Sequence, residues 1–132
     1  MVNVDAALAF KQLELADPTT TYLPSGDFVG EDMLAFWDSA ANDAIASGQY
    51  SFVRAAGVMP SVLRDLPGGI EAFMAYEMDL NDYTSRHPEF VLLCMYDLEA
   101  FGGGVILDLL RTHPKLLLGG LVVDNPHFLS PN

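Results

Sequence analysis

The chain has 132 residues, of which 51% are hydrophobic, and its 6 basic and 18 acidic side chains give a formal net charge of −12. This length suits a single domain, residues 1–132, with a core of its own, and the apolar fraction is too high for a disordered chain. The negative charge disfavours direct contact with nucleic acid or with an anionic membrane surface. A single cysteine, the lack of a signal-peptide pattern and apolar runs too short to cross a bilayer predict a cytoplasmic location.

The first half of the chain is predicted to contain two helices and two strands. A short helix over residues 3–10 precedes a short strand over residues 12–16, and the stretch from there to residue 27 is predicted to be a loop. The clearest helix spans residues 31–47, because apolar side chains recur there at helical spacing. A strand is predicted over residues 50–56.

The second half continues the alternation of helix and strand. A helical turn over residues 60–66 precedes a helix over residues 70–85, and a further helix is predicted over residues 97–112. The continuous apolar runs over residues 90–96 and 115–123 are typical of strands that are buried on both faces. Helix-length connections between strands are normally right-handed crossovers between parallel strands. The sequence therefore predicts a three-layer α/β fold, with a mostly parallel sheet flanked by helices.

This topology predicts where a site would lie, because ligands bind at the carboxyl ends of the strands in such sheets. His87 and His113 precede strands, so we expect them at the opposite edge, where each would cap the end of a helix. The residues that follow strands, and that we expect at the binding edge, are Met59, Tyr96, Asp97, Asp124 and Asn125.

Four of the candidate residues have a structural interpretation beside the functional one. Asp97 precedes a predicted helix and suits an N-cap, and Asn125 before Pro126 is a natural turn former. Cys94 and Tyr96 are two positions apart on one strand, so their side chains point to the same face. Cys94 lies inside an apolar run, which is typical of a small buried hydrophobe rather than of a nucleophile.

Glu77 is the carboxylate that the pattern places on an apolar helix face, together with Phe73 and Leu80. A buried carboxylate must be paired or hydrogen-bonded, or it becomes protonated. Arg54 is the only charged residue of its strand and is the expected partner. A structural Arg54–Glu77 ion pair and a ligand-binding role for both residues remain open alternatives.

Several motifs of known chemistry are absent from the sequence. There is no phosphate-binding GxxxxGK[ST] loop, no GxSxG nucleophile motif and no zinc-ligand spacing among the three histidines and the one cysteine. The sequence therefore predicts no cofactor, no metal site and no catalytic residues.

The stretch from Tyr76 to Phe128 resembles the MEDS family, the methanogen/methylotroph DcmR sensory domain. That family tends to show an arginine on a strand, a Tyr-Glu pair on the next helix, then Cys-x-Tyr-Asp, His-Pro and Asn-Pro. The matching positions here are Arg54, Tyr76-Glu77, Cys94-Met95-Tyr96-Asp97, His113-Pro114 and Asn125-Pro126. Order and approximate spacing agree across about residues 20–128.

The resemblance implies a sensory or regulatory domain with a RecA/KaiC-like α/β core, which in this family is usually attached to a DNA-binding or histidine-kinase module. Two departures from the family pattern stand out. We expect the chain to begin inside the family domain, without the usual first strand and helix, and Val58 precedes Met59 where the family often has a glutamate. A missing first strand would leave an apolar sheet edge or helix face uncovered, so we expect a homodimer or a partner protein to cover it.

Three hypotheses about function follow. The first is a non-enzymatic sensory domain in signal transduction or transcription control, with a histidine kinase or transcription regulator as its expected partner. Its expected ligand-binding residues are Arg54, Met59, Glu77, Cys94, Tyr96, Asp97 and Asn125. The second is a protein-interaction module whose acidic helices dock a partner. The third is an enzyme that uses Cys94 with an unidentified base.

Overall fold

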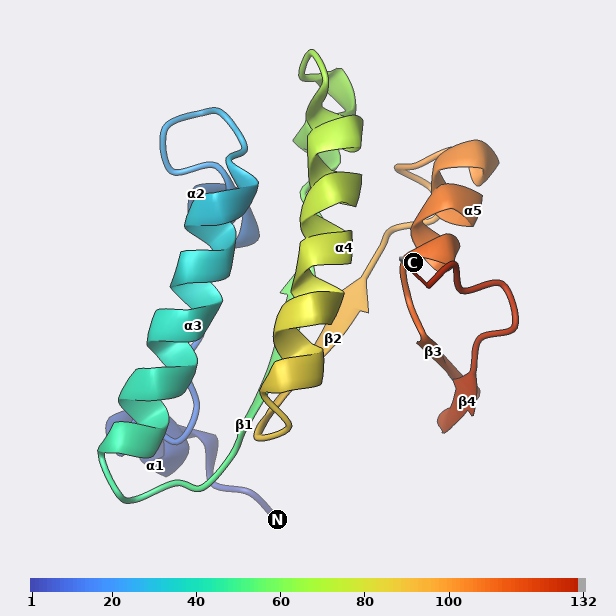
Figure 1. Ribbon diagram of the computed structural model, residues 1–132. Coiled ribbons are helices and arrows are strands. Elements are labelled where there is room, and N and C mark those ends of the chain that lie inside the picture. The colour runs from blue at the N-terminus through green and yellow to red at the C-terminus, as the bar shows by residue number, and fades with distance from the viewer. Residues whose placement is uncertain (131–132) are drawn as a thin grey trace.

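The computed structural model describes residues 1–130 and arranges them as helices in front of a short parallel pair of strands, with a separate hairpin to one side (Figure 1). The elements in chain order are α1 (Val4–Ala9), α2 (Pro18–Tyr22), α3 (Gly30–Ala46), β1 (Val53–Val58), the 3-10 helix η1 (Ser61–Asp65), α4 (Gly69–Arg86), β2 (Phe90–Met95), α5 (Gly103–Arg111), β3 (Lys115–Leu118) and β4 (Leu121–Asp124). Within residues 1–130, no helix combines the length and apolarity that a membrane span requires.

The long helices agree with the sequence pattern. Helix α3 differs from the predicted range by one residue at each end, and α4 extends the predicted range by one residue at each end. Met33, Trp37 and Ala41 are all buried, as their spacing of four residues predicts for one face of α3. The short helix α1 and the helical turn η1 are also confirmed.

The predicted strand over residues 12–16 is wrong. These five residues are exposed and belong to no strand, because after α1 the chain turns through Lys11, which has a φ of +54°. The predicted loop that follows contains α2. The side chain of Asp17 accepts a hydrogen bond from the backbone N–H of Thr20, and Pro18 occupies the first turn, which is a helix-start pattern that the sequence analysis missed.

Strands β1 and β2 form the parallel pair that the alternation of elements predicted. Gly57 is opposite Cys94 and Val58 is opposite Met95 in the register of this pair. Helices α3 and α4 cover one face (Figure 1). The core between them contains a group of aromatic side chains, Tyr22, Phe28, Trp37, Phe73 and Tyr76.

The opposite face of the β1–β2 pair is bare, so the prediction that strand 90–96 is buried on both faces is wrong. Burial alternates along both strands, because no third layer of residues 1–130 covers this side. We call this surface the bare face. It consists of the exposed residues Arg54, Ala56, Val58, Val91, Leu93 and Met95.

The C-terminal part of the fold departs from the predicted four-stranded parallel sheet. The single strand predicted over residues 115–123 is an antiparallel hairpin, in which β3 and β4 are joined by Gly119 and Gly120. Both glycines have positive φ values, of 55° and 83°, which a two-residue hairpin turn requires. The helix predicted over residues 97–112 begins only at Gly103. Residues 97–101 form a turn instead, in which the N–H groups of Ala100 and Phe101 donate to the carbonyl oxygen of Asp97.

Candidate functional site

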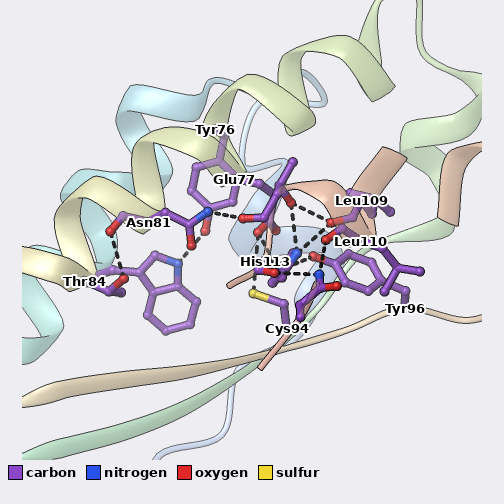
Figure 2. Close-up of polar contacts among 12 residues, drawn as sticks. Tyr76, Glu77, Asn81, Thr84, Cys94, Tyr96, Leu109, Leu110 and His113 are labelled. Atoms are coloured by element: carbon purple, nitrogen blue, oxygen red, sulfur yellow. Dashed lines mark hydrogen bonds and ion pairs between the residues drawn. The ribbon is translucent and has the colours of Figure 1, made fainter. Parts of the chain in front are cut away.

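Four polar side chains converge beside the aromatic core (Figure 2). Glu77 comes from α4, Cys94 from β2, Tyr96 from the residues directly after β2, and His113 from the connection between α5 and β3. We call these four residues the Glu77 cluster. The side chain of Glu77 is only 3% exposed and that of His113 is 18% exposed, so the cluster lies inside the protein but reaches the surface at His113.

Local geometry explains why three of these side chains meet. Phe73, Glu77 and Leu80 are all buried, which places Glu77 on the inward face of α4. Cys94 and Tyr96 both point toward α4, because alternate residues of an extended chain share a face. The inward orientation of Glu77 and the shared face of Cys94 and Tyr96 confirm the predictions from the sequence, whereas the direction of that face was not predicted.

Short contacts connect the members of the Glu77 cluster. His113 Nε2 lies 3.1 Å from Glu77 Oε2 and 3.1 Å from the hydroxyl oxygen of Tyr96. The Cys94 thiol donates to the same Oε2 atom, with the sulfur at 3.6 Å. One carboxylate oxygen is therefore shared by an imidazole nitrogen and a thiol.

The ring of His113 is fixed by its other nitrogen. Nδ1 lies 2.8 Å from the carbonyl oxygen of Leu109, which can only accept a hydrogen bond. The proton therefore belongs on Nδ1, and Nε2 presents a lone pair, or a second proton, toward Glu77. Thr112 supports this arrangement, because its hydroxyl donates to the same carbonyl oxygen and lies 2.9 Å from Nδ1.

The segment that carries His113 is held from two sides. Nδ2 of the buried Asn125 donates to the carbonyl oxygens of Leu110 and His113, at 2.6 and 2.7 Å. On α4, one turn after Glu77, Asn81 donates to the carbonyl oxygen of Thr112. The side-chain amides of Asn125 and Asn81 thus fix the position of His113 relative to α4.

Burial and the carboxylate of Glu77 control the protonation of the cluster. Burial, followed by the charge of Glu77, raises the pKa of the Cys94 thiol and that of the Tyr96 phenol far above their ordinary values. Burial alone would lower the pKa of His113, but its hydrogen bond and charge interaction with Glu77 outweigh burial and raise it. At neutral pH the thiol and phenol are therefore protonated.

The Glu77 cluster combines three kinds of donor atom that bind metal ions. The ligand atoms of Glu77, Cys94 and His113 all lie within 4.8 Å of one another, and no other such group of three is found among residues 1–130. The arrangement can either share protons within the protein or hold a cation between the three side chains.

The predicted ion pair between Arg54 and Glu77 is wrong. Arg54 is exposed on the bare face, on the opposite side of β1 from α4, where its guanidinium lies 5.3 Å from the centre of the Phe52 ring. Glu77 pairs with His113 instead. The strand alternation that turns Val53 and Ala55 inward turns Arg54 outward.

The other expected site residues lie outside the Glu77 cluster. Met59 is buried and extends the pairing of the strands, since its N–H donates to the carbonyl of Met95. Asp97 is exposed, and its side chain accepts from the N–H of Glu99 in a turn rather than capping α5. Asp124 pairs with Lys115 at 2.6 Å on the exposed hairpin. Asn125 reaches the site only indirectly, by holding the backbone of His113.

The two histidines that were expected to cap helix ends, His87 and His113, differ from each other. His87 caps the end of α4 as predicted, with Nδ1 2.8 Å from the carbonyl oxygen of Tyr83. His113 makes the equivalent contact with α5, but its predicted place at the far edge of the sheet is wrong. That prediction assumed that residues 115–123 join the parallel sheet. The Gly119-Gly120 pair, a recognised hairpin signal, could have shown that they do not.

Two surface hollows are lined by residues other than those that follow β1 and β2 in the chain. One, of about 370 Å³, is formed by residues of α2, α3 and the loop between them. The other, of about 220 Å³, is lined by Met74, Met78, Asp108, Arg111, Thr112 and Leu129. Neither includes any of the four residues of the Glu77 cluster.

Comparison with known proteins gives one match. The family model described as MEDS, methanogen/methylotroph, DcmR sensory domain, matches residues 1–114, which include every residue of the Glu77 cluster. No curated protein and no solved structure matches the chain.

Proposed function

The chain belongs to the MEDS family, the methanogen/methylotroph DcmR sensory domain, and from this membership we propose that it acts as a non-enzymatic sensor in signal transduction or transcription control. The family supports a sensory or regulatory role. The finer assignment to signalling or transcription, and the location of the sensing site, are our proposal.

The observation that carries the proposal is the contact between the buried Glu77 and the half-buried His113, with Cys94 beside it. Buried ionisable groups are costly for folding and are frequent at functional sites. Ligand binding that changed the Glu77–His113 contact would shift the segment carrying His113 relative to α4. The β3–β4 hairpin follows directly on that segment and would transmit the change.

A non-enzymatic role agrees with the chemistry of Cys94. A nucleophilic cysteine reacts as a thiolate, which a lowered pKa favours. Burial, followed by the charge interaction with Glu77, raises the pKa of Cys94 instead, which disfavours the thiolate.

Transcript profiling in the source organism tests the regulatory role. We expect deletion of the gene to change a limited set of transcripts, and we expect wild-type protein to restore them and Glu77→Gln not to. Glu71→Gln, an exposed carboxylate in the first turn of the same helix, is the matched control and should restore the transcripts. Unchanged transcripts after deletion would contradict the proposal.

The bare face supports a second candidate function, that of a protein-interaction module. Parallel sheets are normally covered on both faces, whereas Val91, Leu93 and Met95 are 58%, 40% and 39% exposed here. We propose that a second copy of the chain or a partner protein covers this face. The two functions are compatible, since a sensor must pass its signal to an output.

A further inference from the structure

We infer that Glu77, Cys94 and His113 are the ligands of a divalent transition-metal ion of the zinc class, held within the Glu77 cluster. This inference rests on the proposed function, because it names the chemistry that the sensing site recognises. The three donors are a carboxylate oxygen, a sulfur and an imidazole nitrogen, a mixture that suits Zn²⁺ and related borderline ions rather than Mg²⁺ or Ca²⁺.

The first argument is the spacing of the donor atoms. Metal–ligand bonds of about 2.0–2.3 Å in a tetrahedral site separate neighbouring ligand atoms by roughly 3.3–3.7 Å. Glu77 Oε2 lies 3.1 Å from His113 Nε2 and 3.6 Å from Cys94 Sγ, and all three donor atoms lie within 4.8 Å of one another. Only small side-chain adjustments would place all three around one ion.

The second argument is the orientation of His113. Histidine ligands usually donate their second N–H to a carbonyl or carboxylate, which fixes the ring and directs the other nitrogen to the metal. Nδ1 of His113 lies 2.8 Å from the carbonyl oxygen of Leu109. Nε2 lies 3.1 Å from Glu77 Oε2. Asn125 and Asn81 hold the same backbone segment in place. The support that a metal ligand needs is therefore already present.

The third argument is that the contacts converge on one oxygen. Nε2 of His113 and the thiol of Cys94 both contact Oε2 of Glu77, where solvent is largely excluded. A proton can bridge only one of these contacts, whereas a divalent cation can contact all three ligand atoms at once. On binding the ion, Cys94 releases its thiol proton to solvent and ligates as a thiolate.

Three protein ligands leave one tetrahedral position available, as in zinc sites that exchange a water or a small ligand. The hydroxyl of Tyr96 lies 3.1 Å from Nε2, so it borders this position. Because the side chain of His113 is 18% exposed, the ion and its exchangeable ligand can reach the site from the surface.

Titration of the metal-free chain with Co²⁺ under reducing, chelator-free conditions tests the inference. We expect one ion per chain, with the near-ultraviolet charge-transfer absorption of a cobalt–thiolate bond and the intense visible bands of a tetrahedral ion. Zn²⁺ should displace the Co²⁺ and abolish both signals. A titration without thiolate absorption would overturn the inference, and this result needs no variant that might fail to fold.

Matched variants identify the ligands. We expect Cys94→Ser to lose the charge-transfer band. His113→Gln should weaken Co²⁺ binding by more than about 100-fold, since loss of an outer-shell partner alone costs roughly 10–100-fold. His87→Gln is the control, because His87 caps α4 through an equivalent contact and lies outside the cluster. Equal binding by the two histidine variants would overturn the assignment.

The metal site and the regulatory role can fail separately. If the transcripts respond to Glu77→Gln although the chain binds no Co²⁺, the sensor proposal stands and the metal site is refuted. If the chain binds stoichiometric Co²⁺ but no transcripts respond, the metal site stands and the proposed regulatory role is refuted.

Discussion

Trp37 and Tyr76 form a hydrogen bond inside the core, where either group would be costly to leave unpaired. The indole N–H of Trp37 donates to the hydroxyl of Tyr76 at 2.7 Å, and the two residues are 8% and 2% exposed. Their rings come from α3 and α4, so this bond connects the two helices that cover the sheet. Tyr76 also precedes Glu77, and the core therefore fixes the helix face that carries the cluster.

We expect Tyr76→Phe to lower the free energy of unfolding by about 1–3 kcal/mol, because the buried N–H of Trp37 loses its acceptor. Urea denaturation followed by fluorescence measures this change, since Trp37 is the only tryptophan. Tyr83→Phe is the control. It removes a 3.0 Å hydrogen bond to the partly exposed Asp38, which water can replace, so its effect should be smaller. Equal stability of Tyr76→Phe and wild type would contradict this account.

At the scale of elements, the junction between η1 and α4 determines where the helix bearing Glu77 begins. Gly68 has a φ of +64°, and the backbone of Gly69 passes close to η1. A Cβ atom at Gly69 would lie 2.4 Å from the carbonyl oxygen of Leu63, a backbone atom that cannot move aside without shifting η1. In contrast, a Cβ atom at Gly104 in the first turn of α5 meets nothing within 4 Å.

The same substitution should therefore have opposite effects at these two positions. We expect Gly69→Ala to destabilise the protein by about 1–3 kcal/mol through overpacking. Gly104→Ala should stabilise it by up to about 1 kcal/mol, because alanine favours the helix. Thermal and urea unfolding of both variants measure the two changes. A stabilised Gly69→Ala protein would show that the junction adapts more easily than its geometry indicates.

Elements with a strong local signal were predictable from the sequence, and those that depend on distant partners were not. The spacing of apolar residues predicted α3 and α4, and it also predicted that Glu77 points inward. Strand alternation placed Cys94 and Tyr96 on one face. The position of His113 depends on the chain turning back at Gly119-Gly120 and on the hydrogen bonds of Asn125, neither of which follows from local spacing. The metal-compatible group was missed because its three ligands come from separate elements.

At the scale of the whole molecule, the bare face is an apolar surface on a strongly acidic chain. The net charge of −12 opposes self-association. The apolar side chains of β1 and β2, however, gain free energy when they are removed from water. An exposed parallel pair without a covering layer is unusual, and we expect burial of this face to outweigh the repulsion in moderate salt, which screens the charges.

Two methionines of similar exposure allow a matched test of this expectation. Met95 is 39% exposed on the bare face, and Met78 is 44% exposed on α4, which covers the other face. We expect light scattering to find wild type and Met78→Glu as dimers at high concentration. Met95→Glu should dissociate at least about tenfold more readily, because a buried unpaired carboxylate costs more than the roughly 1.4 kcal/mol that this factor represents. A wild-type chain that stays monomeric at high concentration would exclude a second copy as the partner of the bare face. A different protein would then be the expected partner.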